Sequence, residues 1–257
     1  MKNTIVLEPI QIPKGKKVYF ASDFHLGVPL KNKLETEIKV VKWLDSIKED
    51  AAILFLLGDL FDFWYEYRKV VPKGFVRFLG KLAELSDSGV KIILFHGNHD
   101  MWMSDYLEKE LNATIYSNPV SVSIDNKHFH MGHGDGLGPK ETGYKILRWF
   151  FRNKTCIWLF RHIPPLIGMS IAHTWSKSSR FSNQEKEDGF KGEENEYILQ
   201  YCLETESVQH HDYYIFGHRH LILDLPVGEN SRYLNLGEWV NNSHYISFNG
   251  KLEHHDF

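Results

Sequence analysis

The stretch from Ala52 to Asp62 constrains the fold of this chain more than any other feature. Its first six residues, Ala-Ile-Leu-Phe-Leu-Leu, form an unbroken apolar run that ends at Gly58. A run of this length bounded by a glycine is typical of a strand that is buried on both faces of a sheet. The chain then turns at Gly58 and delivers Asp59 at the carboxyl end of the strand, where α/β sheets bind their ligands. A carboxylate in this position can offer its two oxygens to two different cations.

The rest of the chain alternates between predicted strands and helices, which indicates an α/β fold. Apolar residues at helical spacing predict amphipathic helices from Lys33 to Glu49 and from Phe75 to a stop at Gly89. Two alternating runs predict a hairpin around Asp125-Asn126. The predicted strands, in chain order, are Lys16–Ala21, the strand that begins at Ala52, Lys91–Phe95, Val120–Ile124, His128–Met131, Tyr213–Phe216, Arg232–Leu236 and His244–Phe248.

Five of the predicted strands end in a short polar cluster in which Asp, Asn or His stands next to glycine. One such cluster is compatible with an ordinary turn, but turn chemistry alone does not account for five. Because the carboxyl ends of strands in an α/β sheet meet at one edge, we expect the five clusters to lie together at one edge of the sheet. The clusters are Ser22-Asp23-Phe24-His25-Leu26-Gly27, Gly58-Asp59, His96-Gly97-Asn98-His99-Asp100, Gly132-His133-Gly134-Asp135-Gly136 and Gly217-His218-Arg219-His220.

Length and composition exclude several classes of protein. With 257 residues, we expect a single domain over residues 1–257 with a helical insertion at residues 140–190. The formal net charge of -3 gives no general attraction to nucleic acid. Cys156 and Cys202 lie in apolar helical patterns, so we expect them to be reduced. We find neither a cleavable signal nor a run of about 18 apolar residues, and therefore expect a soluble or peripheral protein.

The residue types in the five clusters point to metal ions. Strand ends are rigid, and glycines let a loop approach a cation closely. Imidazole nitrogens, amide oxygens and carboxylate oxygens together suit Mn, Fe, Zn or similar metals rather than Ca or thiolate-bound Zn. This set can build two adjacent metal sites bridged by Asp59. Two cations about 3.5–4 Å apart can activate a bridging water and stabilise a phosphoryl group during in-line attack.

The same clusters resemble, in order, the five motifs of the calcineurin-like metallophosphoesterases, from residue 18 to about residue 237. The motifs are Asp23-Phe24-His25, Gly58-Asp59, Gly97-Asn98-His99-Asp100, Gly132-His133 and Gly217-His218-Arg219-His220. The resemblance implies a four-layer αββα sandwich of the metallophosphoesterase type, with the insertion as a helical hydrophobic cap. It also implies two divalent metal ions. The first would be held by Asp23, His25, Asp59 and His220, and the second by Asp59, Asn98, His133 and His218.

His99 and Asp100 are the predicted catalytic residues. His99 follows a predicted metal ligand, where it could act as a general acid or stabilise charge, and Asp100 could orient it. Asn98, His99 and His218 are also expected to contact the substrate. Asp62 is either a partner of the site or a helix N-cap, and Asp135 belongs either to the site or to a turn. Seven other histidines are interpreted as structural residues on strand surfaces or in the tail: His96, His128, His130, His210, His211, His254 and His255.

Between His133 and His218 the chain carries a segment rich in aromatic and basic residues, from Tyr144 to Trp175. Pro164-Pro165 divides it into at least two helices. Two interpretations are open. The segment is an ordinary amphipathic helical pair that covers the sheet, or it is a lid whose apolar face and basic rim suit an amphiphile with acyl chains and phosphate. Its continuation, residues 176–180, could bind a phosphate or a sugar, or form a solvated helix end.

Further motifs are similar to those of the UDP-2,3-diacylglucosamine pyrophosphatases, a family within the metallophosphoesterases. They are Gly58-Asp59-Leu60-Phe61-Asp62, Asp87-Ser88-Gly89-Val90, His133-Gly134-Asp135-Gly136-Leu137, Gly143-Tyr144 and Leu236-Gly237-Glu238-Trp239. This resemblance implies hydrolysis of the diphosphate bond of UDP-2,3-diacylglucosamine to UMP and diacylglucosamine 1-phosphate (lipid X) in lipid A biosynthesis.

The same resemblance implies Mn as the metal, a cytoplasmic location and peripheral attachment to the cytoplasmic face of the inner membrane. It implies a nucleotide-sugar lipid as substrate, no nucleic-acid partner and no obligatory protein partner. Members of that family carry Arg where this chain has His99. The residues that the resemblance places near the substrate are Glu141, Tyr144, Ser176, Lys177 and Arg180.

Other functions remain open at this point. A different metallophosphoesterase, such as a phosphodiesterase or phosphatase for another nucleotide or phospholipid-like substrate, would need no apolar cap. A protein that keeps the fold without catalysis would be expected to lose ligands, whereas all seven predicted positions hold competent donors. A nuclease is disfavoured because Lys and Arg form no evident backbone-tracking pattern outside the insertion.

Overall fold

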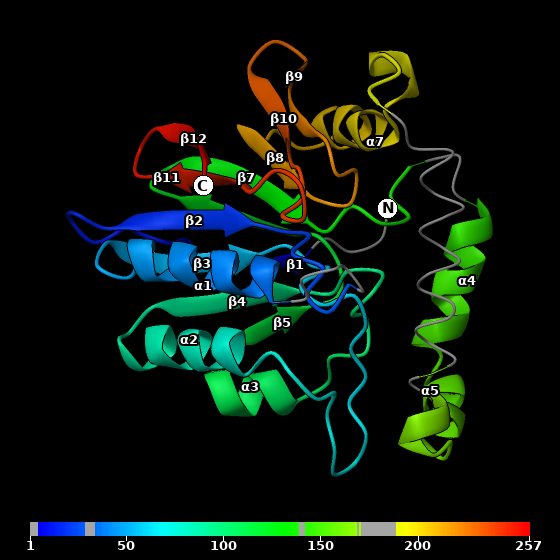
Figure 1. Ribbon diagram of the computed structural model, residues 1–257. Coiled ribbons are helices and arrows are strands. Elements are labelled where there is room, and N and C mark those ends of the chain that lie inside the picture. Colours follow the sequence, from blue (N-terminus) through cyan, green and yellow to red (C-terminus); the bar gives the residue numbers. More distant parts are fainter. Residues whose placement is uncertain (1–4, 29–33, 139–141, 169, 171–188) are drawn as a thin grey trace.

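Two six-stranded sheets packed face to face form the centre of the computed structural model, which describes residues 5–28, 34–138, 142–168, 170 and 189–257 (Figure 1). In spatial order, the first sheet contains β12 (Leu252–Asp256), β11 (His244–Phe248), β2 (Lys17–Ala21), β3 (Ala51–Leu56), β4 (Lys91–Phe95) and β5 (Thr114–Tyr116). The second contains β1 (Ile5–Val6), β6 (Val120–Ile124), β7 (Lys127–Gly132), β8 (Tyr213–Phe216), β10 (Ser231–Leu236) and β9 (Ile222–Val227). Strands β2 to β5 run parallel, and the β11–β12 hairpin adds to them in the antiparallel sense.

The alternation of side chains along β3 shows how one strand serves two apolar layers. Ile53 and Phe55 pack between the two sheets, while Leu54 and Leu56 pack against the helices outside the first sheet. Successive side chains of a strand point to opposite faces, so a strand covered on both sides must be apolar throughout. The prediction that this stretch is a strand buried on both faces is confirmed.

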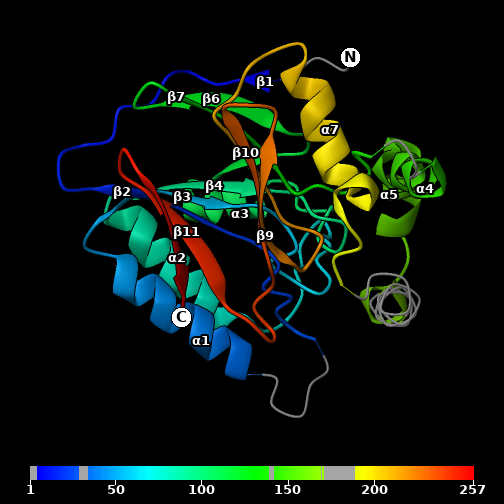
Figure 2. The ribbon, with the colours of Figure 1, turned by 90° about the horizontal axis from the view of Figure 1, so that it is seen from above.

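Helices cover the outer faces of both sheets (Figures 1 and 2). The first sheet is covered by α1 (Glu35–Ile47), α2 (Val76–Asp87) and α3 (Tyr106–Leu111), which share one apolar cluster with it. The second sheet is covered by α7 (Tyr197–Glu206), which follows the short 3-10 helix η1 (Glu193–Asn195) and packs through Ile198 and Leu199. The predicted order of helix, sheet, sheet and helix is therefore confirmed.

The five polar clusters do not lie at the edge of one sheet, as the sequence led us to expect. Three follow β2, β3 and β4 of the first sheet, and two follow β7 and β8 of the second. The two sheets present these strand ends to a common side, so residues from both sheets still meet. A strand covered on both faces has the same apolar pattern in either sheet, and its pattern cannot say to which sheet it belongs.

Two histidines that we interpreted as strand-surface or tail residues are buried, His130 in β7 and His211 just before β8. His130 Nδ1 and His211 Nε2 each lie 2.9 Å from the hydroxyl of Ser121, and His130 Nε2 lies 2.8 Å from the Tyr201 hydroxyl. Burial, reinforced by His211, lowers the pKa of His130 to about 3, so this ring is a neutral part of the core. Strand β12, which the sequence pattern did not predict, contains His254 and His255.

The described part of the insertion forms α4 (Thr142–Arg152) and α5 (Lys154–Arg161), which stand beside the sandwich rather than over a sheet (Figure 2). The two helices separate at Asn153, whose side chain accepts hydrogen bonds from the amides of Thr155 and Cys156 at 2.9 and 3.3 Å. Helix α5 ends before Pro164-Pro165, and residues 165–168 are helical again. The prediction of at least two helices is confirmed, with an additional break at Asn153.

Within the described ranges, no helix combines the length and apolar content that crossing a bilayer requires. Both cysteines are free thiols, as expected: Cys202 is buried in α7, and Cys156 is half-buried in α5.

Candidate metal centre

Four side chains from three loops converge at the common side of the two sheets. Asp23 and His25 follow β2, Asp59 follows β3, and His220 follows β8. Their ligand atoms all lie within 4.8 Å of one another. The Nε2 atoms of His25 and His220 are 3.0 Å apart, and His220 Nε2 lies 3.3 Å from Asp23 Oδ1. The structure thus brings together every residue predicted to hold the first metal ion.

A second group shares Asp59 with the first. The ligand atoms of Asp59, His133 and His218 lie within 4.8 Å of one another, and Asn98 Oδ1 lies 3.1 Å from His133 Nε2. His133 Nδ1 donates to the carbonyl of Leu57 at 2.8 Å, which leaves Nε2 directed at this group. The four residues predicted for the second metal ion are therefore also neighbours.

The carboxylate of Asp59 joins the two groups through a single oxygen. Its Oδ1 accepts a hydrogen bond from the backbone amide of His99 at 2.8 Å. Its Oδ2 lies 3.9 Å from His25 Nε2 and 3.4 Å from His133 Nε2. We expected one carboxylate oxygen for each cation, whereas this geometry offers Oδ2 to both groups because Oδ1 already holds the His99 amide.

The backbone around the site adopts conformations that residues other than glycine rarely use. Such left-handed conformations cost about 1–3 kcal/mol each and concentrate at functional sites. Glycines complete the close packing, since a Cβ atom added to Gly97 or Gly217 would collide with the carboxylate of Asp59 or Asp23. Five of the seven predicted ligands have φ between 46° and 70°: Asp23, His25, Asp59, His218 and His220.

The electrostatics of the cluster fit a divalent cation. Burial lowers the pKa of His25 to about 3 and that of His218 to about 4, so both rings are neutral and can each offer a lone pair. Burial opposes ionisation of Asp59, but the adjacent His133 outweighs it and holds the pKa of this carboxyl well below its usual range.

His133 carries the charge that balances this carboxylate. Burial lowers its pKa, but the charge of Asp59 outweighs burial and raises the pKa of His133 to about 10. A cation at Nε2 would supply the same positive charge in place of the proton. Together the imidazole, carboxylate and amide donors fit borderline divalent metals such as Mn and Zn.

His99 extends the cluster next to His25, with their ring centroids 5.0 Å apart. Its Nδ1 lies 3.0 Å from the backbone carbonyl of Asp62 and 3.8 Å from the Asp62 carboxylate. A proton on Nδ1 would place the lone pair of the neutral ring on Nε2. Asp62 is buried beside His99 and is not a helix N-cap, because the next helix begins at Val76.

Asp100 holds the turn that carries Asp59. This corrects our prediction that Asp100 orients the His99 ring. The ring of His99 instead contacts the backbone carbonyl of Asp62. The buried carboxylate of Asp100 accepts hydrogen bonds from the amides of Leu60 at 2.7 Å and Gly97 at 2.8 Å, and lies 3.3 Å from the amide of Asp59. Burial and the charge of Asp59 raise the pKa of Asp100 to about 7, although the hydrogen bonds from the amides lower it.

We expect Asp100→Ala to lower the free energy of unfolding by about 3 kcal/mol, because buried amides that lose their acceptor cost about 1–3 kcal/mol each. Denaturant unfolding monitored by circular dichroism measures the loss. Asp45→Ala, at an exposed carboxylate paired with Lys81, should change stability by less than about 0.5 kcal/mol. An Asp100→Ala protein of unchanged stability but reduced turnover would instead place Asp100 in the chemistry.

Asp135 is buried and links the site to the insertion. Its Oδ2 lies 3.2 Å from Nε of Arg148 in α4, and its carbonyl accepts a hydrogen bond from Arg148 Nη1 at 2.7 Å. The charge of Arg148 outweighs burial and keeps the pKa of Asp135 below its usual value. Asp135 is therefore more than a turn residue, and its arginine partner was not predicted.

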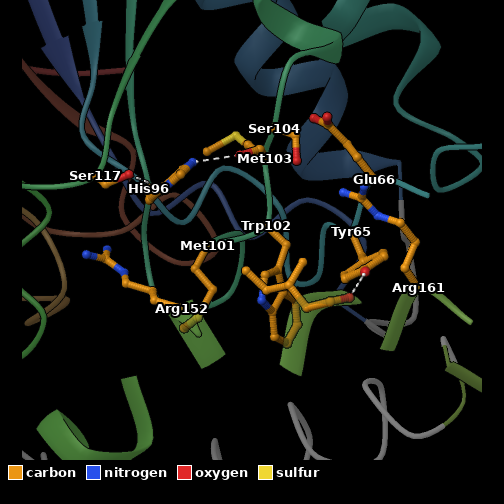
Figure 3. A pocket seen from close by; sticks show the side chains of 11 residues that line it. Tyr65, Glu66, His96, Met101, Trp102, Met103, Ser104, Ser117, Arg152 and Arg161 are labelled. Carbon is orange, nitrogen blue, oxygen red and sulfur yellow. Dashed lines mark hydrogen bonds between the residues drawn. The ribbon is translucent and has the colours of Figure 1, made fainter. Parts of the chain in front are cut away.

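A pocket of about 230 Å³ separates the core loops from the cap helices (Figure 3). Tyr65 and Trp102, which follow the Asp59 and His99 loops, form part of its core wall, and Ile157 and Arg161 of α5 form part of its cap wall. Tyr65 and Trp102 were not predicted as pocket residues, although the aromatic run after Asp62 could have indicated an apolar wall near the site.

Of the predicted cap residues, Glu141, Ser176, Lys177, Arg180 and the side chain of Tyr144 lie outside the described residues.

Comparison with known proteins matches residues 16–221 to the family described as calcineurin-like phosphoesterase. A UDP-2,3-diacylglucosamine hydrolase of Porphyromonas gingivalis is 37% identical over 248 residues, covering 91% of this chain and 94% of that protein. A UDP-2,3-diacylglucosamine hydrolase of Pseudomonas entomophila is 29% identical over 76% of this chain and 81% of its own. Among solved structures, vacuolar protein sorting 29 of Cryptosporidium parvum matches with a TM-score of 0.44 and 11% identity over 95% of this chain and 98% of its own.

Proposed function

The chain belongs to the calcineurin-like phosphoesterases, and from this premise we propose that it hydrolyses the diphosphate bond of UDP-2,3-diacylglucosamine. The products would be UMP and diacylglucosamine 1-phosphate (lipid X), a step of lipid A biosynthesis. The observation that carries the proposal is the 37% identity, over nearly the whole length of both chains, to a hydrolase of that name. The convergence of seven metal-ligating side chains supports it, because diphosphate hydrolysis needs a site that stabilises phosphoryl charge.

We assign two divalent metal ions, with Mn as the proposed identity, to the two ligand groups that share Asp59 Oδ2. When bound, such a pair lowers the pKa of a water molecule and neutralises phosphoryl oxygens. The first group is Asp23, His25, Asp59 and His220, and the second is Asp59, Asn98, His133 and His218.

The chain's own residues orient the substrate around this centre. Asn98, His99 and His218 border the proposed diphosphate position. The Asp62 carbonyl accepts a hydrogen bond from Nδ1 of His99, which leaves Nε2 available. With both ring nitrogens protonated, Nε2 would deliver a proton to the leaving oxygen or meet its charge. Asp100 fixes the turn of Asp59 and so acts on the geometry of the site.

We assign the insertion at residues 140–190 the role of a cap for the lipid part of the substrate. In the pocket beneath α5, Met101, Trp102 and Ile157 provide apolar walls. Figure 3 shows Arg152 and Arg161 on opposite sides of Trp102. This arrangement of apolar and basic side chains would suit a substrate whose acyl chain lies on the apolar walls and whose phosphate lies at the metal centre, with the two arginines nearby. The cap and the sandwich would then act as one domain over residues 1–257.

The described part of the insertion carries large apolar side chains that are exposed to solvent. Basic residues lie on the same helices, among them the exposed Lys154 of α5. This combination favours binding in the headgroup region of an anionic bilayer. We therefore propose peripheral attachment to the cytoplasmic face of the inner membrane. The exposed apolar residues are Trp149, Phe150, Trp158, Leu159, Leu166 and Ile167, with exposures between 51% and 81%.

We expect the double substitution Trp149→Ser and Trp158→Ser to lower binding to anionic phospholipid vesicles at least tenfold, since burying one large apolar side chain contributes about 1.5–3 kcal/mol. Vesicle co-sedimentation measures the bound fraction. Val76→Ser on α2 removes an apolar side chain that is 77% exposed, compared with 68% for Trp149 and 57% for Trp158, and should leave the bound fraction unchanged. Equal binding by both variants would remove the cap from the proposed membrane contact.

The substrate proposal is tested by UMP release. The purified Mn-loaded chain should release UMP from UDP-2,3-diacylglucosamine and much less from UDP-N-acetylglucosamine, which lacks the long acyl chains that the cap is proposed to bind. Bis-p-nitrophenyl phosphate serves as a general diester control. Hydrolysis of the simple diester without UMP release from the lipid would replace the proposal with another phosphoesterase activity.

A further inference from the structure

Arg219 lies between two predicted ligands of different metal ions. Its own side chain is not a metal ligand, because a guanidinium stays protonated and offers no lone pair. Arg219 separates His218 of the second group from His220 of the first. Both flanking histidines have positive φ, 70° at His218 and 54° at His220, so this turn is conformationally demanding. A small change in the turn would move ligands of both groups together.

Other parts of the turn are fixed by hydrogen bonds to neighbouring strands. The amide of Gly217 donates to the carbonyl of His133 at 2.8 Å, and the carbonyl of Gly217 accepts from the side chain of Asn235 at 2.5 Å. The amide of His218 donates to the Asp23 carboxylate at 3.1 Å. The amide of Arg219 also donates to the carbonyl of Gly217, at 2.8 Å, and closes the turn on itself. The side chain of Arg219 adds an anchor outside the turn.

The side chain of Arg219 is anchored to α7. Its Nε lies 3.2 and 3.0 Å from the two carboxylate oxygens of Glu196, and its guanidinium lies 5.5 Å from the ring centroid of Tyr197. The exposures of the Arg219 and Glu196 side chains are only 9% and 1%. Glu196 is the N-cap residue of α7, so its backbone position is set by a packed helix.

A buried ion pair of this kind is a poor source of stability, because removing two charges from water offsets their attraction, and its best-attested use is to specify one arrangement. We propose that the Arg219–Glu196 pair positions His218 and His220 for metal binding, and that both are positioning residues rather than ligands. This inference rests on the proposed two-metal centre. Residues that orient metal ligands from outside typically change metal affinity 10–100-fold when altered.

The test measures Mn²⁺ affinity of the full chain by electron paramagnetic resonance of free Mn²⁺, with thermal unfolding in parallel. Arg219→Lys keeps the charge but not the guanidinium contact, and should weaken Mn²⁺ binding about tenfold or more. The double substitution Glu196→Met and Arg219→Met removes both buried charges. It should unfold near the wild-type temperature and still bind Mn²⁺ about 10–100-fold more weakly. Arg232→Lys, at an exposed pair with Asp224, is the matched control and should bind as wild type.

Wild-type affinity in the double variant, or in Arg219→Lys if the double variant does not fold, would overturn the positioning role and leave the metal centre intact. Failure of the unmodified chain to bind Mn²⁺ would instead overturn the metal centre itself. Weaker binding in Arg219→Lys at an unchanged unfolding temperature supports positioning, since a purely structural pair would alter stability without altering affinity.

Discussion

Asp59→Asn is expected to lower kcat/KM for diphosphate hydrolysis by about 10³-fold or more, equivalent to about 4 kcal/mol. The reason is the position of Oδ2, which faces His25 in one ligand group and His133 in the other. The side-chain NH2 group of the new asparagine would occupy the place of one of the two carboxylate oxygens. At the position of Oδ2 it would face the metal site, and at the position of Oδ1 it would face the backbone amide of His99, which now donates a hydrogen bond to Oδ1. Since altering a partner of a metal ligand already costs 10–100-fold in affinity, loss of a shared ligand should cost more.

Steady-state kinetics and elemental analysis of the same Asp59→Asn preparation check this expectation, with a joint loss of metal and turnover predicted. Asp45→Asn alters an exposed carboxylate of α1, and this variant should keep the wild-type metal content and turnover. An Asp59→Asn enzyme with full metal content and near-normal kcat would show that the two ligand groups do not depend on a common carboxylate.

His99→Ala is expected to lower kcat by about 10²–10⁴-fold, the usual contribution of a positioned general acid. Unlike Asp59→Asn, it should leave the metal content unchanged, because His99 approaches the site from the Asp62 side and is not one of the seven assigned ligands. Kinetics with the lipid substrate and metal analysis together separate the two effects. His128→Ala, at an exposed position in β7, should behave as wild type.

His99→Arg distinguishes the two roles that the geometry allows. Arginine can meet phosphate charge but cannot release a proton near neutral pH. Recovery of most of the activity in His99→Arg would assign charge stabilisation to His99, and activity as low as that of His99→Ala would assign proton transfer. Unchanged kcat in His99→Ala would remove this residue from the chemistry.

Much of the site was predictable because its determinants are local in sequence. Gly58-Asp59 and Gly97-Asn98-His99 follow apolar runs that are too short for a typical helix and are bounded by glycine, which favours buried strands with the polar residues at their ends. The glycines carried equally local information, since Gly97 and Gly217 stand where a side chain would collide with a site carboxylate.

The remaining features depend on contacts between distant parts of the chain. Nothing in the spacing around Asp100 distinguishes an orienter of the adjacent His99 from an acceptor for amides 40 residues earlier, near Leu60. The pairs Asp135–Arg148 and Glu196–Arg219 likewise join separate elements, and each partner alone resembles an ordinary charged residue.

The expectation that all five polar clusters lie at the edge of one sheet failed for a related reason. Apolar periodicity reports that both faces of a strand are covered, but not by which layer. Strand β1, with two residues, and β5, with three, were too short to give any pattern. The break at Asn153 depends on a single capping side chain within a continuous apolar and basic segment.

The central claim, that two cations share Asp59, is tested most directly by anomalous diffraction from crystals of the full chain grown with Mn²⁺. We predict two anomalous peaks about 3.5–4 Å apart on either side of Asp59 Oδ2. One peak should lie among Asp23, His25 and His220, and the other among Asn98, His133 and His218. A single peak, or peaks that avoid Asp59 at saturating Mn²⁺, would contradict the account.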